Sequence, residues 1–460
     1  MKRRWKKGLA AVLSGLVFLS TGVTIYAEDE AKQKTPEQIA IEQEMAAAYA
    51  MPVNSNGLEN WPQGPAVYAE SAIVMDVNSG AILYAKNVDE KRFPASITKI
   101  MTALVTLENS QLTDRVKFTK DSISFLEYGD AHIGMKPGEE ISMEDALYGM
   151  LLASANEVSH AIAENAGGFG YDGFIAKMNE KAEELGCQNT HFVNTNGLHD
   201  DNHYVSARDM AVISSAAFQQ EEFRTVTKTL EHTIPPTAMT AEPRTFQQNH
   251  KMLYPASSYY YEYCVGGKTG YTDQSKTTLV TFADNHDMQL VAVNLKSHGV
   301  NVYTDTRAMF DYAYGSFSKV PIKEHMNEDK VNSLEDENAY VVLPNGVTFD
   351  QLIGTVTEAK TDQEGSREGI LTYTYKDQPV GSAKVKLSNA FYAKSGRELK
   401  PDEVKVTKST EKEKKGFPLW GKIALGAGVF VVAVMIVCVS LAVHRKKKRR
   451  KCRERRRRRS

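Results

Sequence analysis

Short apolar runs separated by turn-forming residues predict two pairs of strands. The runs Ser71–Asp76 and Ala81–Ala85 flank Asn78-Ser79-Gly80, a sequence typical of a turn between strands. Much further along the chain, Thr277–Ala283 and Met288–Leu295 flank a polar stretch of four residues and predict a hairpin. We therefore expect β-structure near both ends of the main folded region.

Between the two strand pairs, the apolar positions follow a helical period. Pro94 to Leu107 predicts the opening of a helix. Ser142-Met-Glu-Asp145 and Ser206-Ala-Arg-Asp209 are capping boxes, in which a serine and an acid three residues later satisfy exposed backbone N–H groups at a helix start. A further helix stops at Gly186, and its shared apolar face consists of Phe174, Met178, Ala182 and Leu185.

From about Val320 the helical patterns give way to short alternating runs, such as Ile370–Tyr375 and Ala383–Leu387. Period-two alternation bounded by turn formers is typical of strands that are buried on one face. The sequence therefore predicts a small all-β domain over residues 319–397, followed by a charged linker over residues 398–422.

The two ends of the chain have the patterns of targeting segments. Residues 1–27 begin with basic residues, continue with an apolar run and end on Ala27, which predicts a secretory signal peptide. Residues 423–443 carry no charge and are long enough, at 1.5 Å per residue, to cross a bilayer core of ~30 Å. Thirteen Lys or Arg follow, so the positive-inside rule places the tail, residues 444–460, in the cytoplasm.

Between these basic ends the chain is acidic: residues 28–444 contain 38 Lys or Arg and 56 Asp or Glu. This charge excludes the protein from the class of nucleic-acid-binding proteins. His199 and His203 have the spacing of metal ligands but lie among turn formers without further ligands nearby, so we expect no metal and no cofactor. Cys187 and Cys264 allow one disulfide, and the sequence leaves their pairing open.

Three short motifs carry candidate chemistry. Ser96 and Lys99, three residues apart at a helix start, share one face, and a lysine can accept the serine proton only if its pKa is lowered. Ser154 and Asn156 supply a hydroxyl and a carboxamide near a helix end. Lys268, in Gly266-Gly-Lys-Thr-Gly-Tyr271, supplies positive charge beside glycines that allow close backbone approach.

Each motif alone has an ordinary structural explanation, but S-x-x-K, S-x-N and K-T-G in this order form the set shared by penicillin-binding proteins and class A β-lactamases. The flanking sequence closely resembles D-alanyl-D-alanine carboxypeptidases, the low-molecular-mass penicillin-binding proteins, over roughly residues 66–318. Segments that carry this resemblance are Ala72–Asp76, Pro94–Leu104, Gly134–Glu139, Asn196–Leu198 and His203–Met210.

The resemblance implies an α/β penicillin-binding-protein fold of the β-lactamase-like type: an antiparallel sheet flanked by helices, and an all-helical part, with the active site between them. The expected organisation of the whole chain adds the all-β domain and one transmembrane helix to this fold. It comprises a signal peptide (1–27), a leader (28–65), a catalytic domain (66–318), an all-β domain (319–397), a linker (398–422), a membrane helix (423–443) and a tail (444–460).

The resemblance also implies a role for each motif residue in a serine-type D-Ala-D-Ala carboxypeptidase. Ser96 would attack the penultimate D-alanine of a peptidoglycan stem peptide, and Lys99 would accept its proton. Ser154 would pass a proton to the leaving nitrogen. The substrate-binding residues would be Asn156 for the peptide amide, Lys268 and Thr269 for the terminal carboxylate, and Tyr271, whose N–H would join that of Ser96 in the oxyanion hole. Penicillin would acylate the same serine covalently.

Several positions depart from the family pattern. Glu157 stands where Asp is usual, and Ser275 and Lys276 replace an Ala-Gly pair. Gln289 aligns with an arginine that helps bind the substrate carboxylate in many relatives, which predicts weaker binding unless Lys276 compensates. Two alternatives are a β-lactamase, which would need an additional glutamate motif that is not found between Asn156 and Lys268, and a catalytically idle wall-binding protein.

Overall fold

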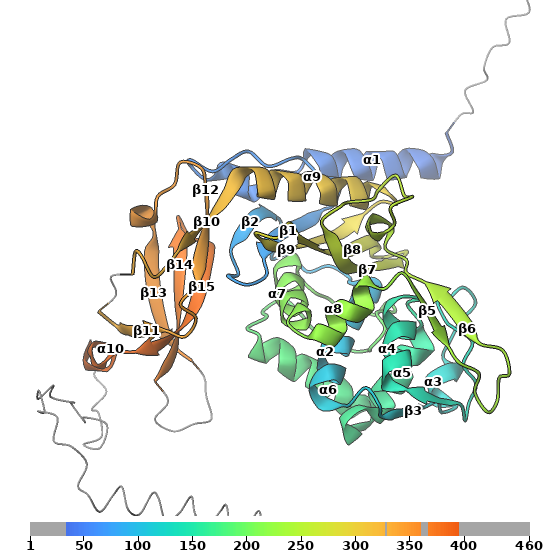
Figure 1. Cartoon of the computed structure of the whole chain (residues 1–460). Helices are drawn as coiled ribbons and strands as arrows, with labels where there is room; N and C mark the ends of the chain where they lie inside the picture. The colour runs from blue at the N-terminus through green and yellow to red at the C-terminus, as the bar shows by residue number, and fades with distance from the viewer. Residues whose placement is uncertain (1–33, 327–328, 360–366, 395–460) are drawn as a thin grey trace, which may run out of the picture. The chain divides into compact units, whose positions relative to one another are not determined.

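The two predicted strand pairs come together in one five-stranded antiparallel sheet. The computed structural model describes residues 34–326, 329–359 and 367–394, and its largest sheet has the strand order β2-β1-β9-β8-β7 (Figure 1). These strands are β1 (Ser71–Asp76), β2 (Ile82–Lys86), β7 (Cys264–Thr272), β8 (Lys276–Asp284) and β9 (Gln289–Ser297). All residues of β1 are buried, as expected for a strand covered on both faces. The edge strand β7 contains the K-T-G motif, which the sequence alone did not place in a strand.

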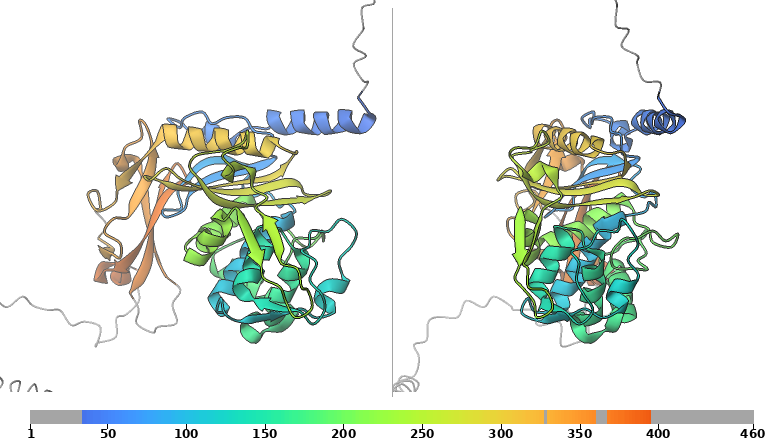
Figure 2. Two further views of the ribbon diagram at one scale, coloured as in Figure 1. Left: turned by 45° about the vertical axis from the view of Figure 1, so that its right-hand side comes forward. Right: turned by 90° about the vertical axis from the view of Figure 1, so that its right-hand side faces the viewer.

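Helices cover both faces of this sheet. Helix α9 (Asn301–Ser316) packs on one face, and α7 (Ala207–Phe218) and α8 (Glu221–Lys228) pack on the other (Figures 1 and 2). Only the serine half of the predicted capping box at the start of α7 is present: Ser206 Oγ accepts a hydrogen bond from Asp209 N, whereas the Asp209 carboxylate accepts from Asn189 N and Thr190 Oγ1. Helices therefore pack on both faces of the sheet, and its edge strands are β2 and β7.

The helical part below the sheet surrounds one central helix, α2 (Lys99–Asn109). Every residue from Lys99 to Thr106 is buried, which fits a helix whose sequence carries no charge from Ile100 to Leu107. The α-helices α4 (Met143–Leu151), α5 (Asn156–Asn165) and α6 (Gly170–Glu184) contact α2, as do α7 and α8. The same part of the protein also contains β3 (Arg115–Lys117), α3 (Asp121–Ser124), β4 (Glu140–Ser142), β5 (Glu231–Ile234) and β6 (Arg244–Gln247). Lys99, the first residue of this helix, is therefore buried in the core.

The segment after α9 has the predicted all-β character, apart from one short helix. Its four-stranded sheet has the order β11-β15-β14-β13, and β10 pairs with β12. The bounds are β10 (Phe317–Pro321), β11 (Val331–Leu334), β12 (Tyr340–Pro344), β13 (Ile353–Glu358), β14 (Glu368–Tyr375), β15 (Gln378–Leu387) and α10 (Asn389–Lys394). Buried and less buried residues alternate along β14, which confirms the period-two interpretation of this run.

In the described part of the leader, residues 34–65, the α-helix is α1 (Pro36–Ala50), whose N-terminus is closed by a capping box between Thr35 and Gln38. The buried Lys86 ties this helix to the sheet, since its Nζ donates to Ala48 O at 2.7 Å and to Val67 O at 2.8 Å. The short 3₁₀ helices are η1 (Asn54–Gly57), η2 (Ala95–Thr98), η3 (Ala166–Gly168), η4 (Lys251–Leu253) and η5 (Phe349–Gln351).

The predicted signal peptide, the membrane helix and the basic tail lie outside the described residues. Within the ranges that are described, no helix combines the length and the apolar character needed to cross a bilayer. The division of the chain at residues 66, 319 and 398 stays a prediction.

Candidate active site

Ser96 and Lys99 are brought together where η2 runs into α2. Lys99 Nζ lies 3.1 Å from Ser96 Oγ, 2.7 Å from Asn156 Oδ1 and 2.6 Å from the carbonyl oxygen of Asn196. The two closer partners are carbonyl-type oxygens, which only accept hydrogen bonds, whereas the Ser96 hydroxyl can also donate. A neutral amine therefore gives its two protons to Asn156 and Asn196 and turns its lone pair toward the Ser96 hydroxyl.

The surroundings of Lys99 favour this neutral form. Complete burial holds the pKa of Lys99 well below its usual range, and the nearby charge of Lys268 lowers it further. The carboxyl groups of Glu157 and Asp130 act in the opposite direction. Burial and the second lysine together outweigh the two acids, so Lys99 loses its proton more readily than an ordinary lysine and can act as a base.

Strand β7 brings the third motif beside η2. Lys268 is buried, burial lowers its pKa to about 7, and its Nζ donates to Thr269 O at 2.9 Å. A Cβ added to Gly270 would lie 2.9 Å from Ser96 N and 2.4 Å from Thr278 Oγ1, so only glycine allows the strand to approach the serine backbone this closely. Tyr271 is exposed, and its hydroxyl donates to Asp273 Oδ1.

The second motif lies at the start of α5. Asn156 is the first residue of this helix; its side chain contacts Lys99, and its backbone N–H donates to Ala131 O at 2.8 Å. Ser154 is buried and has a positive φ of 61°, a conformation that costs a non-glycine residue about 1–3 kcal/mol. No hydrogen bond joins Ser154 to another candidate residue in the described part of the chain. The structure thus links Asn156 directly to the Ser96–Lys99 pair, but not Ser154.

A second strained residue, Ala95, directly precedes Ser96. Its φ is +51°, and its carbonyl oxygen accepts a hydrogen bond from Thr98 Oγ1 at 2.8 Å. Thr98 Oγ1 also lies 2.8 Å from Nε2 of the buried His203. Since Val193 N donates to His203 Nδ1, the ring proton is on Nε2, and a chain of donors runs from His203 through Thr98 to Ala95 O. Burial lowers the pKa of His203 to about 3, so the ring is neutral.

The sequence alone assigned no catalytic role to His203, Thr98, Asn196 or Gly197, although three of the segments that resemble the family contain all four. A Cβ on Gly197 would lie only 1.9 Å from Ala95 O, and its φ of +88° favours glycine. The signal for these residues was the match of Pro94–Leu104, Asn196–Leu198 and His203–Met210 to the family pattern. Their roles depend on contacts between segments about 100 residues apart.

Glu157, noted as a departure from the family pattern, lies behind the site. Its Oε1 accepts a hydrogen bond from Ile133 N at 2.8 Å, and its Oε2 has no hydrogen-bond partner among the described residues. Burial raises the pKa of this carboxyl. Glu157 therefore fastens the 131–135 loop to α5 and opposes the loss of the Lys99 proton.

The predicted placement of Gln289 beside the substrate carboxylate is wrong. Thr269 pairs with Leu279, and Leu279 pairs with Asn294, whereas Gln289 pairs with Asp284 near the opposite end of the hairpin. Five residues separate Gln289 from Asn294 along β9, which is about 17 Å in an antiparallel strand. The Gln289 side chain instead donates to Asp284 Oδ2 at 2.9 Å.

Cys187 and Cys264 are both free thiols, which answers the question that the sequence left open. Burial raises the pKa of each to about 12, so neither is a reactive thiolate at neutral pH. His199 packs edge-on against Phe93, with ring centroids 4.6 Å apart, and does not meet His203 in a common site.

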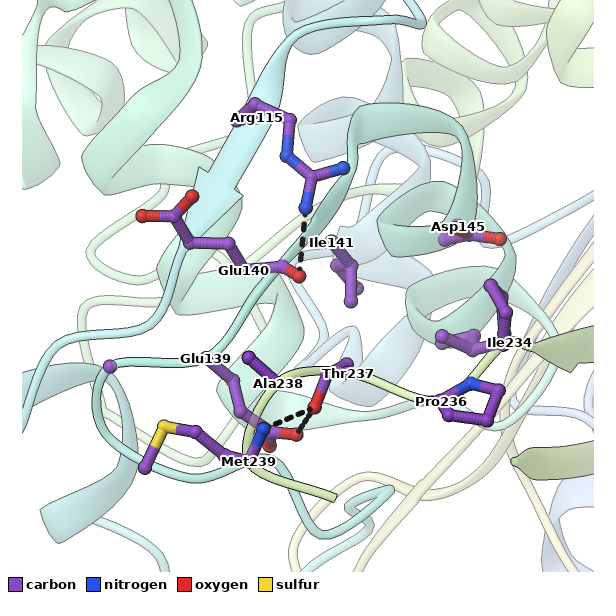
Figure 3. Close-up of a pocket in the computed structure, with 12 residues that line it drawn as sticks. Arg115, Glu139, Glu140, Ile141, Asp145, Ile234, Pro236, Thr237, Ala238 and Met239 are labelled. Carbon is purple, nitrogen blue, oxygen red and sulfur yellow. Dashed lines mark hydrogen bonds between the residues drawn. The ribbon is translucent and has the colours of Figure 1, made fainter. Parts of the chain in front are cut away.

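A pocket of about 390 Å³ lies apart from these residues, between β4 and the connection from β5 to β6 (Figure 3). The buried carboxylate of Glu139 forms an ion pair with Arg244 at 2.8 Å and accepts from Thr237. Arg115, which also lines the pocket, donates to Glu140 O (Figure 3). None of the candidate catalytic residues lines this pocket. The candidate active site is therefore the group of residues around Ser96.

Comparisons with known proteins identify the family to which the sequence is similar. The sequence profile of the family described as D-alanyl-D-alanine carboxypeptidase matches residues 59–299. The D-alanyl-D-alanine carboxypeptidase DacF of Bacillus subtilis (strain 168) is 29% identical over 354 residues, which are 74% of this chain and 86% of the relative. The D-alanyl-D-alanine carboxypeptidase of Streptomyces sp. (strain K15) is 30% identical over 263 residues, 54% of this chain and 88% of the relative.

Solved structures give the same result for the fold. The crystal structure of the Streptomyces K15 DD-transpeptidase superposes with a TM-score of 0.51 at 28% sequence identity. The match covers 55% of this chain and 100% of that chain.

Proposed function

The chain belongs to the D-alanyl-D-alanine carboxypeptidase family, and we propose that Ser96 and Lys99 carry its reaction. The main domain has the penicillin-binding-protein fold that the motifs predicted. The protein is a serine-type carboxypeptidase that acts on D-Ala-D-Ala ends through an acyl-enzyme. The observation that supports our assignment most strongly is the 3.1 Å contact between a buried lysine of lowered pKa and a serine hydroxyl.

In the acylation step, Ser96 Oγ forms a bond to the carbonyl carbon of the penultimate D-alanine while Lys99 Nζ takes the hydroxyl proton. The bond between this carbon and the nitrogen of the terminal D-alanine then breaks. Ser154 passes the proton to that nitrogen, and free D-alanine leaves. Water hydrolyses the acyl-enzyme in the second half of the reaction and restores Ser96.

Binding of the substrate uses the edge strand β7. An edge strand has unpaired backbone groups, so an extended peptide can lie along it as an additional strand. Lys268 and Thr269 bind the terminal carboxylate, and Asn156 binds a peptide amide. The N–H groups of Ser96 and Tyr271 stabilise the oxyanion, which is the interaction that strengthens most in the transition state.

The reaction is tested by release of D-alanine from a peptide that ends in D-Ala-D-Ala, with the full-length protein in detergent. The expected result is stoichiometric D-alanine and no release from the same peptide ending in L-alanine. A protein that hydrolyses penicillin rapidly and leaves the peptide intact would be a β-lactamase, and one that does neither would be a binding protein.

The anchoring of the enzyme is a second part of the proposal. The uncharged segment at 423–443 and the basic tail support a single membrane crossing, and residues 1–27 support export, with the catalytic domain outside the cell membrane and the tail in the cytoplasm. Protease added to intact protoplasts should release an active soluble fragment that ends near residues 401–415. If the protease cut the chain only beyond Arg445, the tail would lie outside the cell and the proposed orientation would be wrong.

A further inference from the structure

A second pocket of about 390 Å³ adjoins the end of β7. Gln274 and Ser275, in the turn between β7 and β8, line one side, and Phe93, three residues before Ser96, lines another. Ser275 Oγ accepts from Thr272 N at 2.9 Å, so the turn is held against the last residue of β7. The pocket therefore begins where the proposed substrate-binding strand stops.

The direction of the substrate along β7 leads toward this pocket. In the proposed function, the terminal carboxylate lies at Lys268 and Thr269, and the scissile carbonyl lies at Tyr271. The peptide upstream of the scissile bond continues in the same direction, past Thr272 at the end of β7, toward the turn that contains Gln274 and Ser275. A group two or three residues upstream of the scissile bond is thus brought to the pocket.

Three cations, Lys91, Arg92 and Lys296, line the pocket together with one carboxylate, Asp201. Glu70, which lies behind them, is 3.3 Å from Arg92 and 2.8 Å from Lys296, and the exposed Glu90 lies 3.8 Å from Arg92, so two of the three cations already have carboxylate partners. Arg92 Nε is buried and has no hydrogen-bond partner within the described residues, which leaves a guanidinium donor unused. The carboxylate of Asp201 also lines the pocket, but it is 92% exposed and lies 3.5 Å from His199 Nε2.

Lys91 adds a third cation that is free to bind a ligand. Its Nζ lies over the ring of Tyr204, 4.3 Å from the centroid, and it forms no ion pair among residues 34–326. A tyrosine face orients an ammonium group without neutralising its charge. Lys91 is therefore poised to take an anionic group that enters between Phe93 and the β7–β8 turn.

We propose that this pocket is a subsite for a carboxylate of the stem peptide upstream of the scissile bond. The inference rests on the proposed function, because it takes its direction from the placement of the terminal carboxylate at Lys268. Peptidoglycan stem peptides offer this chemistry in two forms: the free α-carboxylate of a γ-linked D-glutamyl unit, and the side-chain carboxylate of a diamino dicarboxylic acid. Both are absent from short neutral test peptides.

Three peptides that share the D-Ala-D-Ala end distinguish these sources. The first has an isoglutaminyl unit and an acetylated lysine and carries no upstream carboxylate. The second replaces isoglutamine with isoglutamate, and the third replaces the acetylated lysine with diaminopimelate. For the full-length enzyme we expect kcat/KM to be about three- to tenfold higher for at least one of the two carboxylate peptides than for the first.

The same ratio is then measured in Lys91→Gln and Lys91→Glu. The preference should fall toward one in Lys91→Gln and reverse in Lys91→Glu, while Lys117→Gln, an exposed lysine on β3, keeps the wild-type ratio. A wild-type ratio of one, or a ratio that Lys91→Glu leaves unchanged, overturns the subsite but leaves the carboxypeptidase function intact. Failure to release D-alanine from any of the three peptides overturns the function and the subsite together.

Discussion

His203 Nε2 lies 2.8 Å from Thr98 Oγ1, and through this contact a buried neutral imidazole supports the turn that presents the candidate nucleophile. Thr98 in turn restrains the backbone of Ala95, because its hydroxyl donates to the Ala95 carbonyl oxygen. Ala95 is the strained residue before Ser96. The same backbone supplies the Ser96 N–H that the proposed oxyanion hole requires. His203 is thus a positioning residue that acts through Thr98 and does not touch the substrate.

The first prediction concerns this chain of donors. His203→Ala should slow acylation by saturating penicillin about tenfold, because a buried hydrogen bond is worth about 1–3 kcal/mol and its loss frees the strained turn. His203→Gln, whose amide can accept from Val193 N and donate to Thr98, should recover most of the rate. A purely structural role would lower the melting temperature of His203→Ala and leave its rate per titrated active site unchanged.

The second prediction concerns the acid limb of the pH profile for acylation. The charge of Lys268 lowers the pKa of Lys99, so Lys268→Gln should raise that pKa and move the limb to higher pH, whereas Lys268→Arg should keep it in place. Glu157 has the opposite influence, so Glu157→Gln should move the limb to lower pH. Shifts of the same sign in Lys268→Gln and Glu157→Gln would refute Lys99 as the base.

The third prediction concerns Gly197. Gly197→Ala combines a positive φ with a Cβ that would lie 1.9 Å from Ala95 O, so the turn before Ser96 has to move and acylation should become undetectable in a stopped-flow assay. Gly186→Ala is the matched control, because Gly186 has a φ of +80° and open space around it. It should lose about 1–2 kcal/mol of stability and acylate at the wild-type rate. Equal rates in the two variants would contradict the coupling between Gly197 and Ala95.

The fourth prediction follows from the corrected position of Gln289. Its side chain bonds to Asp284 at the far end of the hairpin, so Gln289→Arg should change kcat/KM on a D-Ala-D-Ala peptide by less than about twofold. The same result is expected in a Lys276→Ala background. An increase in kcat/KM well beyond twofold would show that residue 289 does lie near the substrate carboxylate.

The sequence predicted those elements whose causes are local. Ser142 and Ser206 each accept from the backbone N–H three residues on, as the capping boxes required, and Phe174, Met178 and Ala182 are buried on one face of α6. Each of these features depends on residues within one or two helical turns. For the same reason the two strand pairs were recognised, because each is closed by its own short turn.

Features that depend on the packing of distant segments were not predictable. Gly266–Tyr271 contains three glycines, so it lacked the pattern of a strand, although β8 supplies its pairing. Gln289 was misplaced because the alignment of a hairpin does not reveal which end of a strand faces the site. His203 and Asn196 approach Ser96 and Lys99 only in the fold, and no spacing rule connects them.

The central claim is that Ser96 is the residue that becomes acylated. The most direct measurement is the intact mass of the full-length protein after exposure to benzylpenicillin, followed by peptide mapping of the adduct. We expect one added penicilloyl group on the peptide that contains Ser96, and no added mass in Ser96→Ala at an unchanged melting temperature. An adduct that persists in folded Ser96→Ala, or that maps to Ser154 or any other residue, would contradict the mechanism.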